Sequence, residues 1–389
     1  MSIYIHIPFC NSICSYCDFC KIFYDKKYIK SYLDNLRNEI VDRYKGEEVN
    51  TIYIGGGTPS CLEDDELVML FDIIKVFNLS NDYEFTIEGN VESITESKLN
   101  IMKKYGVNRI SIGVQSFDND VIKLLGRRHT EKEVFDKINL IKRYIDNVNI
   151  DIIYAAYNDI NILKRDIDKA LKLDVKHIST YSLILEDNTL LKVNGFNGID
   201  EDLDYEMYKY IEDILEDNGY VHYEISNYAK KGYESRHNLV YWNNDNYYGF
   251  GLSSTSYING VRRVNTKNLA KYLDGEYMGS VEEESIDIRM ENEVMLGLRK
   301  FNGINLNSFK NTFDTYYKGK FEVVPRLYEE ALVQVLSKSS DEEVAGYQIP
   351  QDVIENYQDY IHCKSGRKAK EELRERYSST YWYYSDYIH

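Results

Sequence analysis

Over its first half, the chain alternates between short apolar runs and longer segments with helical periodicity. The runs with strand character cover residues 3–7, 51–55, 83–88, 109–114, 148–154 and 177–183. The helical patterns between them cover residues 28–43, 64–76, 94–105, 131–144 and 162–173. Apolar strands separated by helices are typical of a parallel sheet covered by helices. The spacing predicts an α/β fold of right-handed β-α-β units that begins to close into a barrel, although an open doubly wound sheet has the same periodicity.

The pattern changes after residue 186. Residues 200–218 are predicted to form an acidic helix, and residues 219–266 a Tyr-, Asn- and Gly-rich loop region. Apolar spacing over residues 286–337 indicates a helix-rich module. We therefore divide the chain into a barrel core (1–185), a region that completes the barrel (186–285), a small helical C-terminal module (286–345) and a divergent tail (346–389).

The overall charge excludes one broad class of protein. Acidic residues number 64 against 47 Lys and Arg, which gives a formal net charge of -17 and argues against a basic nucleic-acid binder. No segment approaches the ~18 consecutive apolar residues of a membrane span. The N-terminus lacks the basic and then apolar regions of a secretory signal. We expect a folded cytoplasmic protein with no transmembrane segment.

Four of the six cysteines are crowded into eleven residues. In a long chain without a secretory signal, such clustering indicates reduced thiols that bind metal. Cys10, Cys14 and Cys17 form a C-x3-C-x2-C pattern directly after the first strand, which suits an iron–sulfur cluster with one iron left open. Zinc is the alternative, with Cys20 as a fourth ligand, although structural zinc normally takes two separated pairs.

Polar residues and glycines follow several of the predicted strands. The glycine triplet 55–57 follows the second strand, where amides free of side chains can approach a carboxylate, or where the chain simply turns. Glu88 ends the third strand, Gln115 follows the fourth and Asp151 lies in the fifth. Barrel sites assemble at such C-terminal strand ends, although each residue by itself also suits a cap or a solvated position.

The cysteine spacing, with Tyr16 before the last cysteine, resembles the radical S-adenosyl-L-methionine (SAM) superfamily. Segments similar to its HemN/HemW group follow in order: IYIHIPFC, TIYIGGGTPSCL, FTIEGN, GVNRISIGVQSFDNDVIKLLGRRHT and NIDIIY. The resemblance extends to about residue 335. It implies a partial (β/α)6-type TIM barrel with a small helical C-terminal domain. It also implies a [4Fe-4S] cluster on Cys10, Cys14 and Cys17, whose open iron is chelated by SAM.

The same resemblance implies a set of SAM contacts. These are Tyr4, Gly56, Gly57, Thr58, Glu88, Gln115, Arg127 and Asp151. Gly56, Gly57 and Thr58 would meet the methionine end of SAM. Hydroxyl and carboxylate groups would take its amino and ribose groups, and the Arg127 guanidinium its carboxylate.

Three features favour the HemW-type heme chaperones within this group over the HemN-type coproporphyrinogen III dehydrogenases, which decarboxylate porphyrinogen propionates in heme biosynthesis. Only nine residues precede Cys10, whereas HemN-type enzymes carry a longer extension. Phe19 stands where HemN-type enzymes have a further cysteine. The segment HNLVYW matches the HNxxYW motif associated with heme binding, with His237 as a candidate heme contact or axial ligand and Tyr241 and Trp242 as walls. For an isolated histidine in a polar loop, a hydrogen-bonded surface position is the alternative.

The expected partners follow from this resemblance. They are heme and acceptor hemoproteins, with no nucleic acid, an association at the membrane surface, and a monomer or homodimer. Catalytic turnover is not required for a chaperone. Because the chain is acidic, a dianionic heme needs local cations, for which we expect Arg236, Arg262 and Arg263. Two segments depart from the family: residues 154–158 read YAAYN instead of YGLPG, and residues 251–257 read GLSSTSY instead of GPGAHSY.

Overall fold

The computed structural model describes residues 1–187, 189–305, 308–309 and 311–313. The predicted tail (346–389), and the part of the helical module (286–345) that follows residue 313, therefore lie outside the described residues. The helix α11 (Ile286–Gly297) occupies the beginning of that module.

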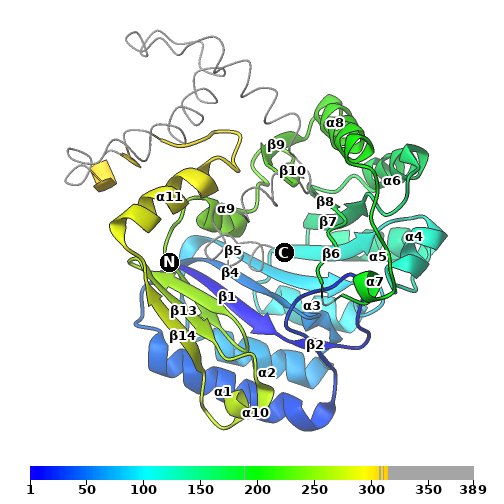
Figure 1. The fold of residues 1–389 in the computed structure, drawn as a ribbon. Coiled ribbons are helices and arrows are strands. Elements are labelled where there is room, and N and C mark those ends of the chain that lie inside the picture. Colours follow the sequence, from blue (N-terminus) through cyan, green and yellow to red (C-terminus); the bar gives the residue numbers. More distant parts are fainter. Residues whose placement is uncertain (188, 306–307, 310, 314–389) are drawn as a thin grey trace, which may run out of the picture.

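A curved mixed sheet organises the described part of the chain (Figure 1). Its six central strands run parallel, and they are β1 (Ser2–Ile7), β4 (Glu48–Gly56), β5 (Asn78–Asn90), β6 (Arg109–Gln115), β7 (Asn147–Tyr154) and β8 (His177–Ser182). Each corresponds to one of the predicted strands. The prediction of a parallel sheet built from β-α-β units is confirmed.

The predicted helices cover one face of this sheet (Figure 1). They are α1 (Lys26–Arg43), α2 (Asp64–Ile74), α3 (Glu96–Lys104), α5 (Glu131–Lys142) and α6 (Ile160–Lys172), and α8 (Glu201–Asp217) matches the predicted acidic helix. Shorter elements without a clear sequence pattern are α4 (Asn119–Leu124), α7 (Leu190–Val193), α10 (Leu269–Leu273) and the 3-10 helix η1 (Pro59–Cys61).

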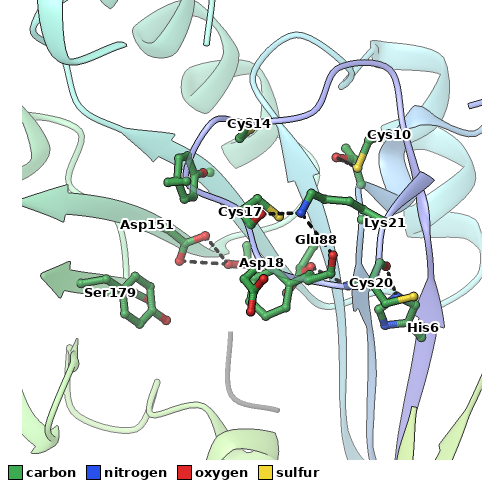
Figure 2. Close-up of a pocket in the computed structure, with 18 of the residues that line it drawn as sticks. His6, Cys10, Cys14, Cys17, Asp18, Cys20, Lys21, Glu88, Asp151 and Ser179 are labelled. Carbon is green, nitrogen blue, oxygen red and sulfur yellow. Dashed lines mark hydrogen bonds between the residues drawn. The ribbon is translucent and has the colours of Figure 1, made fainter. Parts of the chain in front are cut away.

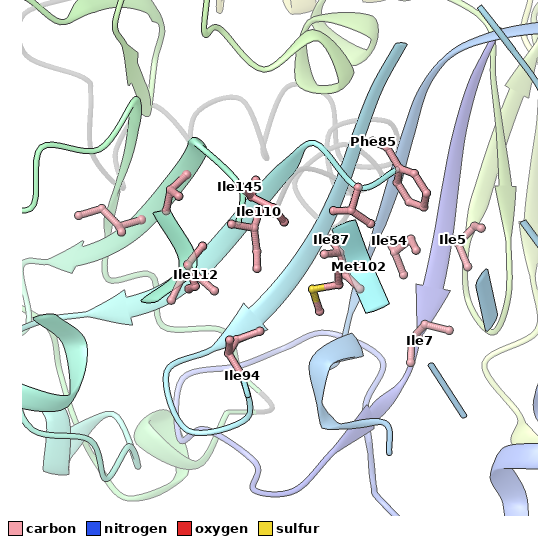
Figure 3. Packing of buried hydrophobic residues seen from close by; sticks show 14 of the residues in the cluster. Ile5, Ile7, Ile54, Phe85, Ile87, Ile94, Met102, Ile110, Ile112 and Ile145 are labelled. Atoms are coloured by element: carbon pink, nitrogen blue, oxygen red, sulfur yellow. The ribbon is translucent and has the colours of Figure 1, made fainter. Parts of the chain in front are cut away.

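Apolar and polar side chains alternate along the central strands. Isoleucines such as Ile5, Ile54 and Ile112 are fully buried in the core that lies between the sheet and its helices (Figure 3). Successive side chains of a strand point to opposite faces, so the intervening residues face the inside of the curved sheet. Tyr4 and Ser111 are two of these inward residues, and both line a cavity. The sequence pattern predicts strands that are apolar on both faces, and this is wrong, because the inner face of the sheet lines this cavity rather than a packed core.

Our prediction of a loop region at residues 219–266 is wrong. It contains β9 (Val221–Glu224), β10 (Asn227–Ala229), α9 (Arg236–Trp242), β11 (Tyr247–Phe250), β12 (Thr255–Ile258) and β13 (Val261–Asn265). β11 pairs parallel with β1, and β12, β13 and β14 (Met278–Glu283) continue that side of the sheet. Strands of three to five residues separated by Gly and Asn are too short for an alternating pattern to be visible.

A fully buried carboxylate joins α1 to this later part of the sheet. Glu39 accepts hydrogen bonds from the backbone N–H of Gly251 at 2.9 Å, from the Asn265 amide at 2.6 Å and from the Tyr272 hydroxyl at 2.7 Å. Arg43, one turn later, pairs with Glu39 at 2.5 Å. Burial raises the pKa of Glu39, and the Arg43 guanidinium opposes that rise.

No helix in the described residues is both long and apolar enough to cross a membrane.

Candidate functional site

A cavity of about 520 Å³ lies inside the curved sheet and extends along the parallel strands, from Arg109 at the start of β6 to Gln115 at its end. The loop that follows β1, the central strands and α9 all contribute to its lining. The predicted cluster cysteines, the candidate SAM contacts and the candidate heme contact all line this one cavity, namely Tyr4, Cys10, Cys14, Cys17, Gly56, Gly57, Thr58, Glu88, Gln115, Arg127, Asp151 and His237. The fold thus collects residues that are spread over more than 200 positions of the chain.

The loop after β1 carries the three predicted cluster cysteines (Figure 2). It is closed at its base by β2 (Phe9–Cys10), which pairs with β3 (Ile22–Phe23). The thiol of Cys10 accepts a hydrogen bond from the Thr58 hydroxyl at 3.6 Å, and that of Cys14 accepts one from Arg127 at 3.8 Å. Burial raises the pKa of Cys10 to about 11. Hydrogen bonds of this kind favour the thiolate form that a metal cluster requires.

The spacing of the thiols bears on which metal group they suit. Around one tetrahedral zinc ion, sulfurs bound at about 2.3 Å lie about 3.8 Å apart. In the described part of the chain, no three cysteine sulfurs lie within 4.8 Å of one another, whereas ligand atoms of Glu212, Glu216 and His222 do. The wider arrangement of Cys10, Cys14 and Cys17 suits a larger iron–sulfur cluster better than a single ion.

Cys20, the candidate fourth zinc ligand, lies beside His6 (Figure 2). The Nε2–H of His6 donates to the carbonyl of Cys20 at 2.8 Å, and the Tyr4 hydroxyl donates to its Nδ1 at 3.0 Å. Burial lowers the pKa of His6 to about 4, so the ring is neutral. These contacts tie the end of the cysteine loop to β1.

Close packing within the protein requires glycine at all three positions of the triplet 55–57. A Cβ at Gly55 would lie 2.9 Å from the Glu88 carboxylate, and one at Gly56, whose φ is +111°, would lie 2.6 Å from the His6 ring. A Cβ at Gly57 would lie 2.7 Å from the backbone of Pro8. The side-chain positions of all three glycines are thus filled by the protein itself, which brings β4, β5 and the start of the cysteine loop together.

Two half-buried carboxyl groups, of Glu88 and Asp151, face the cavity. Glu88 accepts hydrogen bonds from the Tyr53 hydroxyl at 2.7 Å and from the Gly56 N–H at 3.1 Å, and burial raises its pKa to about 8. Asp151 accepts one from the Asn149 amide at 2.7 Å and one from the Ser111 hydroxyl, and burial raises its pKa as well. Both carboxyl groups are therefore held in place without a directly bonded cation.

Gln115 ends β6, and the side chain of Arg127, which follows α4, reaches back to this strand. Gln115 has a φ of 67°, a left-handed conformation that is uncommon outside glycine, and its amide lies where a Cβ at Gly113 would be. Arg127 donates to the Gly113 carbonyl and to Glu92, both at 3.0 Å, and to the Asn90 side chain at 2.9 Å. The guanidinium is thereby fixed next to Cys14.

His237 is buried on α9, not exposed in a loop. Its backbone N–H, at the start of the helix, donates to Glu84. Its ring nitrogens form hydrogen bonds with the Thr51 hydroxyl at 2.8 Å and the Tyr241 hydroxyl at 2.9 Å, and the ring stacks on Tyr53. Burial lowers its pKa to about 3. The imidazole is thus neutral, and both of its nitrogens are engaged within the protein.

Trp242, the other expected wall residue, turns away from the cavity. Tyr241 lines the cavity, whereas the Trp242 ring stacks beneath the guanidinium of Arg299 at 4.3 Å. In a helix, neighbouring residues point in directions about 100° apart, so Tyr241 and Trp242 cannot both face one surface. Of the two expected wall residues, Tyr241 lines the cavity and Trp242 does not.

The cations expected to face the ligand lie elsewhere. Arg262 is buried in an ion pair with Glu284, and Arg236 pairs with Asp82. Among the described residues, the cations that line the cavity are Lys21, Arg109, Arg127 and Lys267. Sequence reasoning missed Arg109, although its position, two residues before Ser111 on one strand, places both side chains on the same inner face.

A family model and several individual relatives match this chain, and their names agree with one another. A sequence model of the Radical SAM superfamily matches residues 4–162. The chain is 39% identical to the heme chaperone HemW of Lactococcus lactis, over 87% of this chain and 89% of that protein. It is 36% identical to that of Bacillus subtilis, over 85% and 92%, and 33% identical to that of Escherichia coli, over 72% and 77%.

Two further matches concern the fold and the C-terminal part. The structure of coproporphyrinogen III oxidase (HemN) from Escherichia coli, a radical SAM enzyme, superposes with a TM-score of 0.74 at 21% identity, covering 93% of this chain and 89% of that one. Residues 303–388 match a family of unknown function, DUF6057. The first match confirms the predicted α/β radical SAM fold.

Proposed function

The chain belongs to the HemW family of the radical SAM superfamily, and on this premise we propose that it is a heme chaperone, which binds heme and transfers it to acceptor hemoproteins in the cytoplasm or at the membrane surface. One observation carries the proposal. The HNxxYW helix α9, the cysteine loop and the candidate SAM residues all line the same cavity. A heme bound there would lie within reach of the cofactor site.

The chain's residues have distinct roles in holding the cofactors. Cys10, Cys14 and Cys17 would hold a [4Fe-4S] cluster, which when bound supplies one electron at its open iron. Thr58 and Arg127 donate hydrogen bonds to two of these thiols and so favour their thiolate forms. For SAM, we retain the contacts inferred from the sequence, which are Tyr4, Gly56, Gly57, Thr58, Glu88, Gln115, Arg127 and Asp151.

His237 is proposed to contact heme as part of the cavity wall. Its bonds to Thr51 and Tyr241 hold the hydroxyl of Tyr241 and the ring of Tyr53 in place. Axial ligation of heme iron by His237 would break one of these two hydrogen bonds and leave a buried hydroxyl to find another partner. If His237 instead contacts heme only as part of the cavity wall, both of its hydrogen bonds remain intact.

The cofactor part of the proposal is tested by anaerobic reconstitution. Wild-type protein should take up about four iron and four sulfide per chain, as a [4Fe-4S] cluster requires. Cys14→Ala should lose both, because three thiolates are needed to hold the cluster. Stoichiometric zinc without sulfide would contradict this part of the proposal.

The heme part is tested by absorption titration of the reconstituted protein. Heme should give a Soret shift, and His237→Ala should weaken binding because the wall loses its support. His237→Gln, which can still hydrogen bond, should recover most of the affinity with the Soret position of wild type. A Soret position that changes in both variants would instead make His237 an axial ligand, and an unchanged titration in His237→Ala would remove it from the site.

An enzymatic assay separates the chaperone from its alternative, oxidative decarboxylation of coproporphyrinogen III. The likeness to the HemN structure gives the fold for either activity. Under anaerobic conditions with SAM and a reductant, we expect no conversion of coproporphyrinogen III. Formation of protoporphyrinogen IX would overturn the chaperone proposal.

A further inference from the structure

Arg109 is an unusual cation for the interior of a protein. It is the first residue of β6, it is 2% exposed, and it lines the cavity. Its Nε atom is buried and donates no hydrogen bond. Within the described ranges, we find no hydrogen bond or ion pair of its guanidinium, whereas Arg127 in the same cavity has four hydrogen-bonding partners.

The two nearby carboxyl groups do not fill this gap. Arg109 lowers the pKa of both Glu88 and Asp151, against the larger effect of burial, so their charges interact. Their oxygens, however, accept hydrogen bonds from Tyr53 and from Asn149 instead. An arginine cannot escape the cost of burial by losing its proton, so its donors require acceptors that the described residues do not supply.

Arg109 lies at the end of the cavity that is farther from the cysteine loop. Arg109 and Gly113 lie on the same strand, four residues and thus about 13 Å apart. Gly113 is tied through Arg127 to Cys14 of that loop. In the sheet register, Arg109 lies opposite Thr86 of β5, and Thr86 lies opposite Tyr53 of β4. The ring of Tyr53 stacks on His237 of α9. Arg109 therefore lies at the level of α9 and away from the cysteine loop.

We propose that Arg109 forms a carboxylate-binding subsite at this end of the cavity. The planar guanidinium matches a carboxylate with two parallel hydrogen bonds, which makes arginine the preferred side chain for this group. Two ligands of the proposed function carry carboxylates, namely heme through its propionates and SAM through its methionine end. Because Arg127 lies beside the cluster cysteines, a heme propionate is the expected occupant, and in this respect the inference rests on the proposed function.

The test compares heme with heme dimethyl ester, which lacks free carboxylates, on reconstituted protein. Arg109→Gln should weaken heme binding about tenfold or more, as expected for a charge-assisted bidentate pair. The ester should bind wild type and Arg109→Gln equally. Arg109→Lys should recover only part of the affinity, because an ammonium lacks the planar fork. Arg263→Gln, which removes an exposed arginine, is the matched control and should bind heme like wild type.

A second arm titrates SAM and decarboxylated SAM. Loss of SAM affinity in Arg109→Gln, with no effect on the decarboxylated compound, would assign the subsite to SAM. The inference is overturned if Arg109→Gln changes neither heme nor SAM affinity, or if it weakens heme and its ester alike. If wild type binds no heme, the proposed function fails, and the SAM arm alone decides the inference.

A thermal melt of the ligand-free protein distinguishes a ligand-binding arginine from a structural one. An unpaired buried charge destabilises the empty fold, so Arg109→Gln should melt at or above the temperature of wild type. A marked fall in melting temperature would show that Arg109 holds the fold together, and would count against the subsite.

Discussion

At the scale of single residues, two loop positions near the cavity carry backbone strain. Ala155 and Ser253 have φ values of 63° and 60°, in the left-handed region that favours glycine. They stand at the positions where the family segments YGLPG and GPGAHSY have glycine. The loops therefore keep a glycine-like backbone after losing the glycine, at a cost of roughly 1–2 kcal/mol per residue.

A pair of alanines tests this strain. Ala155→Gly and Ala156→Gly both remove a buried methyl group and both add freedom to the unfolded chain. Only Ala155→Gly relieves a positive φ, so it should be more stable than Ala156→Gly by about 1–2 kcal/mol in urea unfolding. Equal midpoints for the two variants would contradict the strained backbone at Ala155.

Glu88 should make the ligand-free protein sensitive to pH. Its pKa is raised from 4.5 to about 8 by burial, so the folded state favours the protonated carboxyl. Its contribution to stability is complete below pH 4.5 and is lost as the pH rises to about 8. The melting temperature of Glu88→Gln, taken as a difference from wild type at the same pH, should therefore rise between pH 4.5 and about pH 8. Above that range the difference should stay constant.

The control for this experiment is Glu282→Gln, which removes an exposed carboxylate on β14. Its difference from wild type should not follow the same trend, because water solvates that group in both states. A flat difference for Glu88→Gln would mean that Glu88 is ionised in the folded protein throughout this range.

At the scale of elements, α1 is joined to the later strands by Glu39. The carboxylate receives donors from Gly251, Asn265 and Tyr272, so one side chain connects three segments that follow it by more than 200 residues. The parallel pairing of β11 with β1 lies beside this contact. The helix thereby fixes the part of the sheet that the sequence pattern did not reveal.

Loss of this carboxylate should be costly. Glu39→Ala leaves Arg43 without its buried partner, and we expect a loss of about 3 kcal/mol or more in the free energy of unfolding. Asp34→Ala, on the same helix, removes an exposed partner of Lys30 and should cost less than about 0.5 kcal/mol. Urea unfolding measures both. Similar losses for the two variants would show that the Glu39 contacts do not stabilise the fold.

At the scale of the whole molecule, an acidic chain encloses a cavity whose lining includes several cations. The net charge is -17, yet Lys21, Arg109, Arg127 and Lys267 line the cavity. General attraction for an anionic ligand is therefore absent, and recognition depends on groups held in place at short range. The curved sheet makes this possible because its inner face is polar and its outer face supplies the packed core.

Sequence patterns were sufficient for the strands and helices of the first half and for some of the residues that meet in the cavity, among them the cluster cysteines. Strands such as β6 carry enough apolar residues to be recognised, and the spacing of Cys10, Cys14 and Cys17 indicates a metal group regardless of the fold. The resemblance to a known family supplied the remaining site residues. Short strands such as β11 and β12 escaped prediction, since four residues show no clear period.

The sequence by itself thus determined the α/β class and the cysteine loop, because these depend on local pattern and residue type, while its resemblance to a known family supplied the candidate SAM and heme contacts. Only the tertiary structure decided that both ring nitrogens of His237 are hydrogen bonded, that Trp242 faces Arg299, and that the Nε atom of Arg109 has no hydrogen-bonding partner among the described residues. Burial and hydrogen bonding arise between segments far apart in the chain. For that reason no local pattern could reveal them.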